Sequence, residues 1–474
     1  MSMLETSESQ WANEELFSAY LPDRRHVKRA ISMLTRMAQR PAGRVLDVFE
    51  TSAERQGAYD LLQNSTIRAD AIAASIAEAT VMRAAGDGEM YVAVDGSSAA
   101  LTDKLGTKNF GAVGTNGKGA RGLKMINAYG VSMSGVPLGI TAQVWWARKS
   151  VGKHRRDHQT RKLADKETTH WCDAIDRTIE TAARVAPHVR LCLLLDREGD
   201  GVHTLEKVAA SGHDFIVRSS HNRRLESSGK VPRYLRDELA KTKPCGAYQL
   251  TVLGGPGRTA REARMVVRFG TFTLRMQDKA TGTISRLTLT AVSARETGTT
   301  PRGETPLHWI LLTNRAVTSL DEACAVVYGY SMRWRIEEFH RTWKSGACNI
   351  EGSQLRKKDH FIKWATLMAA IAARIERLKV LARTEPTLPA SVELNPYEIK
   401  ALVLNRRRTK KRTDPMPTDN PTVGEAVRWL ADIGGYTGKS SGGPPGSTTI
   451  RRGFDRIAPV ALALEQLEKE GKLR

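Results

Sequence analysis

The stretch from Tyr330 to Lys344 carries the residues best suited to chemistry. It contains neither Gly nor Pro and mixes polar and apolar residues at helical spacing, which predicts one helix. At about 100° per residue, its polar residues fall within an arc of about 80°. That face carries Tyr330, Arg333, Glu337, Arg341 and Lys344. A single carboxylate among three cations and a phenol predicts a surface for an anionic ligand, although a solvated basic face fits the same pattern.

The opposite face of this helix is apolar and must pack on a core, because so short a helix is not stable alone in water. It carries Met332, Ile336, Phe339 and Trp343. Glu338 lies off the polar face by the same count, which makes Glu337 the candidate functional acid.

Two aspartates follow short apolar runs that predict buried strands. Asp95 follows residues 91–94, and Asp196 follows residues 191–195. Ligand sites in open α/β sheets gather beyond the carboxyl ends of strands, so two such strands side by side would bring both acids together. One such Asp alone is more often a turn or a helix cap. Together with Glu337, the two predict a cluster of acids.

The composition favours a polyanion as partner. The 474 residues include 73 Lys and Arg against 51 Asp and Glu, a formal net charge of +22. Binding phosphates releases counterions, so this excess favours nucleic acid. The chain shows no apolar run of transmembrane length and no signal-peptide pattern, so we expect a cytoplasmic protein without membrane contact. Five scattered cysteines without a CxxC pair argue against disulfides and zinc.

The first 85 residues predict a small helical domain. Asp23 is a candidate N-cap, and Thr51 with Glu54 resembles a capping box. The first long helix gathers its basic residues on one side, and these are Arg25, Arg29, Arg36 and Arg40. This side predicts DNA binding, although a solvated basic face is an equal alternative.

The rest of the chain predicts an α/β domain followed by helices. A β-rich stretch at about 223–305 interrupts the α/β pattern and is interpreted as an insertion. Arg218 lies near the end of the strand before it. A contact with phosphate and a simply solvated side chain fit this position equally well. Residues 361–384 predict a long helix, residues 405–412 a basic loop, and residues 459–473 a last helix that packs on its own chain or on a partner.

These residues resemble a known family, the Asp-Asp-Glu cut-and-paste transposases of the IS-four group, and most closely the Tn-five type. The resemblance rests on Asp95, Asp196 and the pattern Tyr330-x(2)-Arg333-x(3)-Glu337-x(6)-Lys344. It implies an RNase H-like α/β catalytic core with a β-rich insertion, at residues 86–360. It also implies an all-α DNA-binding domain at 1–85 and a mainly α dimerisation domain at 361–474.

The resemblance also implies roles for single residues. Asp95, Asp196 and Glu337 would be the catalytic carboxylates and would hold two divalent cations, Mg²⁺ with Mn²⁺ able to substitute, because Mg²⁺ prefers oxygen ligands. DNA contacts are implied for Tyr330, Arg333 and Lys344, with help from Arg341 and Arg218. Trp309 matches a position that stacks on a flipped base, although an ordinary core role is the alternative.

We therefore expect a DNA transposase of the bacterial cytoplasm, associated with the nucleoid. It would bind transposon ends and target DNA as double-stranded DNA, assemble a homodimeric synapse, cut through a hairpin intermediate and join 3′-OH ends to target DNA. The alternatives are a metal-dependent nuclease that does not join, a catalytically silent DNA-binding inhibitor of transposition, and a charge-driven RNA-binding protein.

Overall fold

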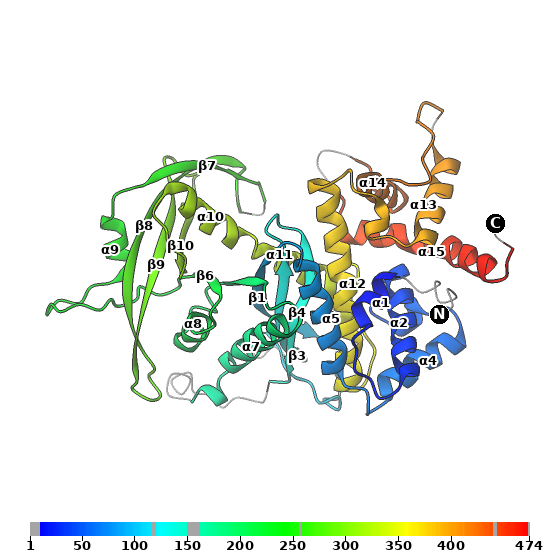
Figure 1. Ribbon diagram of the computed structural model, residues 1–474, viewed down its shortest axis with the longest axis horizontal. Coiled ribbons are helices and arrows are strands. Elements are labelled where there is room, and N and C mark those ends of the chain that lie inside the picture. The colour runs from blue at the N-terminus through cyan, green and yellow to red at the C-terminus, as the bar shows by residue number, and fades with distance from the viewer. Residues whose placement is uncertain are drawn as a thin grey trace.

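The computed structural model describes residues 10–114, 120–148, 162–255, 257–410, 412–438 and 443–472. A twisted sheet occupies one half of the molecule, and the helices of the two chain ends cluster in the other half (Figure 1). The long helix α12 (Lys358–Thr384) runs between them. The two ends of the chain therefore lie side by side although they are far apart in the sequence.

The N-terminal helices are α1 (Gln10–Leu16), α2 (Arg24–Gln39), α3 (Val45–Val48), α4 (Ser52–Gln63) and α5 (Ala69–Ala84). Both expected caps are confirmed. Asp23 accepts a hydrogen bond from the Arg25 N–H at the start of α2, and Thr51 and Glu54 form a reciprocal capping box on α4. The apolar side of α2 is buried, which leaves its arginines on the other side.

The central sheet has ten strands in the order β2-β3-β1-β5-β6-β10-β9-β8-β7, with β4 beside β3. Its first half comprises β1 (Glu89–Ala100), β2 (Gly111–Ala112), β3 (Arg121–Val131), β4 (Pro137–Trp146), β5 (Arg190–Leu195) and β6 (Asp214–Arg218). Strands β1, β5 and β6 are parallel and are joined through η1 (Leu163–Asp165), α7 (Thr168–Val185) and α8 (Val202–Ala209). Alternate side chains of β1 enter two separate cores, so both faces of the sheet are covered.

The β-rich stretch extends the same sheet and is not a separate layer. After α9 (Leu235–Lys241) come β7 (Gly246–Val252), β8 (Arg261–Gln277) and β9 (Ile284–Thr297). Strand β9 pairs with β10 (His308–Thr313), which in turn pairs with β6. The turn residues that suggested an insertion mark where strands end, but they do not predict which distant strands pair.

The predicted single helix from Tyr330 to Lys344 is wrong. Tyr330 belongs to α10 (Leu320–Ser331), and a new helix, α11, runs over Trp334–Lys344. Between them the Arg333 N–H bonds to the Tyr330 carbonyl and the Ile336 N–H to the Arg333 carbonyl, three residues back instead of four. Because of this tighter turn, Tyr330 does not share the helical phase of the residues on α11.

The C-terminal part comprises η2 (Ile350–Gly352), α12, η3 (Ala390–Val392), α13 (Pro396–Thr409), α14 (Val423–Ile433) and α15 (Ser447–Lys469). The predicted basic loop at 405–412 is wrong for residues 405–409, which end α13, and residue 411 lies outside the described part. The last helix begins twelve residues earlier than expected, at Ser447, and contains Pro459. None of the described helices is long and apolar enough to cross a membrane.

Candidate active site

Parallel pairing of β1 with β5 brings the two aspartates together. Val94 lies opposite Leu195 in this pairing, so the next residues, Asp95 and Asp196, are neighbours. The expectation that both strands end at their acid is correct only for β5. Strand β1 continues to Ala100 because its other edge stays paired with β3, and Asp95 therefore lies within a strand.

Helix α11 brings the third acid to the same place. Its residues Ile336, Phe339 and Trp343 are fully buried, and Phe339 stacks on Tyr129 of β3 with ring centroids 4.9 Å apart. This packing directs Glu337 and His340 towards Asp95, and one donor atom from each of the three lies within 4.8 Å of the others. Asp196 is outside this trio but lines the same cavity.

We call this space the carboxylate cavity. It has a volume of about 480 Å³ and is lined by Asp95, Gly96, Ser97, Asp196, Glu198, Trp334, Glu337, His340, Arg341, Lys344, Ser345 and Glu351. Sequence reasoning named five of these twelve lining residues as site residues and missed the other seven, among them Glu198, Trp334, His340 and Glu351. Two of the missed residues could have been found from their spacing. Glu198 lies two residues after Asp196, and His340 lies about one helical turn after Glu337.

The carboxylate cavity gathers more acidic than basic side chains. Burial raises the pKa of Asp95 to about 8, with Arg333 opposing the rise and the charges of Asp196 and Glu337 adding to it. The Arg333 guanidinium lies 3.4 Å from both Asp95 and Glu337. Asp95, Asp196 and Glu337 together offer the oxygen donors that a divalent cation prefers.

His340 is held as a neutral imidazole. Its Nε2 accepts a hydrogen bond from Asn127 Nδ2 at 2.9 Å, and Asn127 Oδ1 accepts one from Gln143 Nε2 at 2.9 Å. Burial, together with the positive charges of Lys344 and Arg333, lowers the pKa of His340 to about 3. His340 therefore adds no positive charge beside the carboxylates.

Tyr330 and Arg333 do not form an exposed face, contrary to the prediction, because both are buried. Burial raises the pKa of the Tyr330 phenol, and the nearby positive charges of Arg333 and of Arg218, at the end of β6, oppose this rise. The partly buried Trp309 of β10 meets the Tyr330 ring edge-on, with centroids 6.2 Å apart. These three residues thus form one cluster next to Arg333.

The remaining two cations of the predicted polar face, Arg341 and Lys344, line the carboxylate cavity. Arg341 is exposed. Lys344 places its Nζ 3.3 Å from Ser97 Oγ and 3.9 Å from Glu351. Glu338 points elsewhere and pairs with Arg335 at 2.8 Å, as its position off the polar face predicted.

The arginines of α2 are separate from this site. A second hollow of about 510 Å³ is lined by Arg25, Arg29 and Arg36, together with Lys28 and residues of α4. Arg36 also pairs with Glu54 at 3.2 Å and with Glu465 of α15 at 3.5 Å. Arg40 does not line the hollow and pairs with Glu50.

Comparison with known protein families gives three matches along the chain. A transposase DNA-binding family matches residues 8–67, a transposase DDE domain matches residues 164–373, and a Tn5 transposase dimerisation domain matches residues 370–465. The DDE match contains Asp196 and Glu337, while Asp95 precedes it. These domains bind DNA, transfer phosphoryl groups with a divalent metal and form dimers. Since the matches together cover most of its length, the chain belongs to the Tn5-type DDE transposases.

Proposed function

We propose that this transposase binds the ends of its element, cuts them through a hairpin intermediate and joins the released 3′-OH ends to target DNA. We assign the catalytic and metal-binding roles to Asp95, Asp196 and Glu337. The observation that carries this assignment is their convergence from β1, β5 and α11 on one cavity, where the pKa of Asp95 is raised. A silent DNA-binding inhibitor would have no need to keep three buried or half-buried acids together.

The three carboxylates would hold Mg²⁺, with Mn²⁺ as a substitute, and the bound metal would activate the attacking oxygen and stabilise the leaving oxygen. Arg333 keeps Asp95 and Glu337 in place in the absence of DNA through its two contacts. Arg341 and Lys344, on the wall of the same cavity, are positioned to bind phosphate oxygens beside the acids.

The cluster of Arg218, Trp309 and Tyr330 supports the proposed hairpin step. A cation, a partly buried indole and a buried phenol lie together beside Arg333. This combination suits a phosphate and an unstacked base, which would stack on Trp309 when the DNA end is sharply bent.

We further propose that residues 1–85 recognise the element's ends, that 86–360 form the catalytic domain and that 361–474 mediate dimerisation. Recognition would use Arg25, Arg29 and Arg36 on α2 and Arg40 directly after it. Dimerisation would use α15, where Val460 and Leu467 are 41% and 38% exposed. The protein would act at the nucleoid, where its DNA substrate lies.

The test uses the full chain, labelled duplexes from the flanks of its native gene, and Mg²⁺. We expect a hairpin, release of the end and joining to a target plasmid. Glu337→Gln should abolish all three, while the matched control Glu338→Gln should retain them because Glu338 lies outside the cavity. Binding without cutting by the wild-type protein would support a silent binder, and cutting without joining would support a nuclease.

A further inference from the structure

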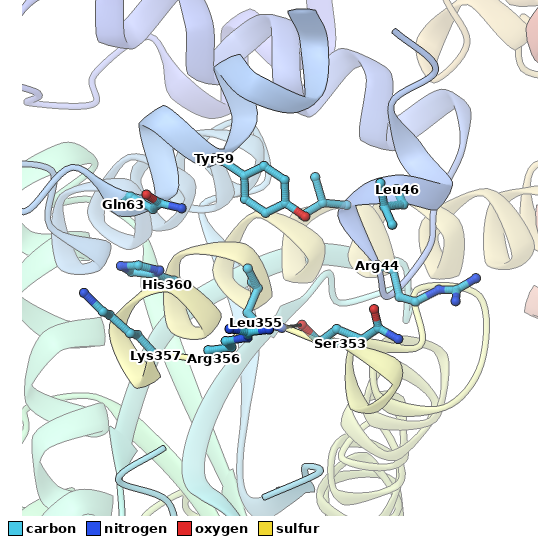
Figure 2. A pocket seen from close by; sticks show the side chains of 11 residues that line it. Arg44, Leu46, Tyr59, Gln63, Ser353, Leu355, Arg356, Lys357 and His360 are labelled. Atoms are coloured by element: carbon cyan, nitrogen blue, oxygen red, sulfur yellow. Dashed lines mark hydrogen bonds between the residues drawn. The ribbon is translucent and has the colours of Figure 1, made fainter. Parts of the chain in front are cut away.

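A cavity at the junction of the N-terminal helices and α12 has the chemistry of a phosphate site. Its volume is about 470 Å³. One wall is formed by Arg44, Val45, Leu46, Tyr59 and Gln63, and the other by Ser353, Gln354, Leu355, Arg356, Lys357 and His360. In Figure 2, Tyr59 and Gln63 of α4 point towards the segment that leads into α12. We call this space the junction cavity.

The junction cavity is positively charged. Three permanent cations and His360 line it, and no acidic residue is among its described lining residues. Burial lowers the pKa of His360, the positive charges of Lys363 and Lys357 add to this effect, and the negative charge of Asp359 opposes it. Arg44 is partly neutralised by Asp47, which accepts two hydrogen bonds of 2.7 Å from it. An anion would relieve this concentration of charge.

Several hydrogen-bond donors of this cavity are unused. Within the described part of the chain, the side chains of Tyr59, Gln63, Arg356 and Lys357 make no hydrogen bond or ion pair. In contrast, Lys363 nearby is fully engaged with the carbonyls of Leu62 and Asn64. Unused donors of both walls therefore face one space, as expected of a site that is completed by an oxygen-rich ligand.

The junction cavity lies close to the carboxylate cavity along the chain. Glu351 lines the carboxylate cavity, and Ser353 lines the junction cavity. Two residues span at most about 7 Å, and a DNA strand advances about 3.4 Å per nucleotide. Glu351 is fixed by accepting the Ala100 N–H at 2.9 Å, so the two cavities are joined by an anchored segment.

From this geometry we infer that the junction cavity clamps one backbone phosphate of the transposon-end duplex between α4 and the start of α12. Tyr59 and Gln63 donate from one wall, and Arg356 and Lys357 from the other. The bound phosphate joins the DNA-binding domain to the helix that packs behind the active site. This inference rests on the proposed function, and it adds residues of α4 and of the segment that leads into α12 to the DNA contacts.

The test measures binding of the full chain to the labelled end duplex by fluorescence anisotropy, with EDTA present. The measurement is repeated at KCl concentrations from about 50 to about 200 mM, because DNA affinity depends strongly on salt in this range. Arg356→Ala should weaken binding by about threefold to tenfold. It should also reduce the slope of log affinity against log salt by about 0.9. The matched control Lys358→Ala removes the same charge two residues away, outside the cavity, and should change affinity by less than about twofold.

A double-mutant cycle tests whether both walls hold the same phosphate. Tyr59→Phe removes only a hydroxyl, and its effect should be clearly smaller in the Arg356→Ala background than in the wild type. Additive effects, or equal effects of Arg356→Ala and Lys358→Ala, would overturn the clamp.

The two proposals fail differently in this design. If the wild type binds and cuts the ends but Arg356→Ala behaves like Lys358→Ala, only the clamp is wrong. If the wild type prefers no end sequence over random DNA, the proposed function fails and the clamp fails with it.

Discussion

Replacing Arg374 by Met should strongly destabilise the junction between the two ends of the chain. The Arg374 side chain is 3% exposed, and its Nη2 lies 2.9 Å from Glu398 of α13, which is 2% exposed. Its Nε donates to the Glu393 carbonyl at 3.1 Å, and its guanidinium lies 5.0 Å from the Trp11 ring centroid. One side chain thus connects α1, α12 and α13.

The expected loss follows from what the substitution leaves behind. Breaking a buried ion pair from one side costs about 3–5 kcal/mol, because the remaining charge stays buried without a partner. Glu398 would keep one hydrogen bond, from the Asn395 N–H at 2.8 Å. Losing the cation–π contact adds about 1–2 kcal/mol. Since neighbouring terms are not additive, we expect a total of about 4 kcal/mol.

Urea unfolding, followed by tryptophan fluorescence and circular dichroism, measures this loss. The control Arg407→Met breaks a pair with Asp419, which is 79% exposed, and should cost less than about 1 kcal/mol. The double variant Arg374→Met with Glu398→Gln removes both charges and should recover at least half of the loss. A cost below about 1 kcal/mol for Arg374→Met, or a double variant less stable than the single one, would refute the reasoning.

Three further perturbations follow from the structure. Glu337→Gln should lower metal-dependent end cleavage at least about 100-fold, and EDTA should do the same to the wild type. Calorimetry should also show that Glu337→Gln binds Mn²⁺ more weakly than the wild type. Unchanged Mn²⁺ binding would mean that Glu337 is not a metal ligand. Partial burial opposes ionisation of Glu167, but hydrogen bonds from neighbouring cations outweigh it and lower its pKa to about 2. Its ionised form therefore stabilises the fold above pH 4.5, by about 1 kcal/mol after allowance for its exposure. Thermal melts of the wild type and Glu167→Gln should converge as the pH falls from 4.5 towards 2, whereas a constant difference would contradict this. Gly453→Ala would place a Cβ 2.2 Å from the Leu430 carbonyl oxygen and force α14 and α15 apart. In the same urea titration, this should lower the free energy of unfolding by about 1–3 kcal/mol. The control Gly446→Ala should change it little, because the space around Gly446 is open.

Local patterns predicted most helices and strands well. The caps at Asp23 and Thr51 and the strand that ends at Leu195 agree with the structure, because capping and hydrophobic patterning act within a few residues. The same reasoning failed at the α10–α11 junction. There the break comes from tertiary packing, since Tyr330 packs against Trp309 while α11 packs against β3.

The sequence by itself determined the residue types of the site and the family. Asp95, Asp196 and Glu337 could be singled out by their local context, and the excess of basic residues indicated DNA. Charge and local spacing are properties of a few neighbouring residues, so they can be read without a fold.

Only the tertiary structure decided which of these residues share an environment. The register of β1 against β5 makes Asp95 and Asp196 neighbours, and the docking of α11 adds His340 and the buried Arg333. It also brings Tyr59 opposite Arg356 across nearly 300 residues of chain. Such pairs depend on strand register and helix packing between distant segments, which leave no signal in the spacing of either segment alone.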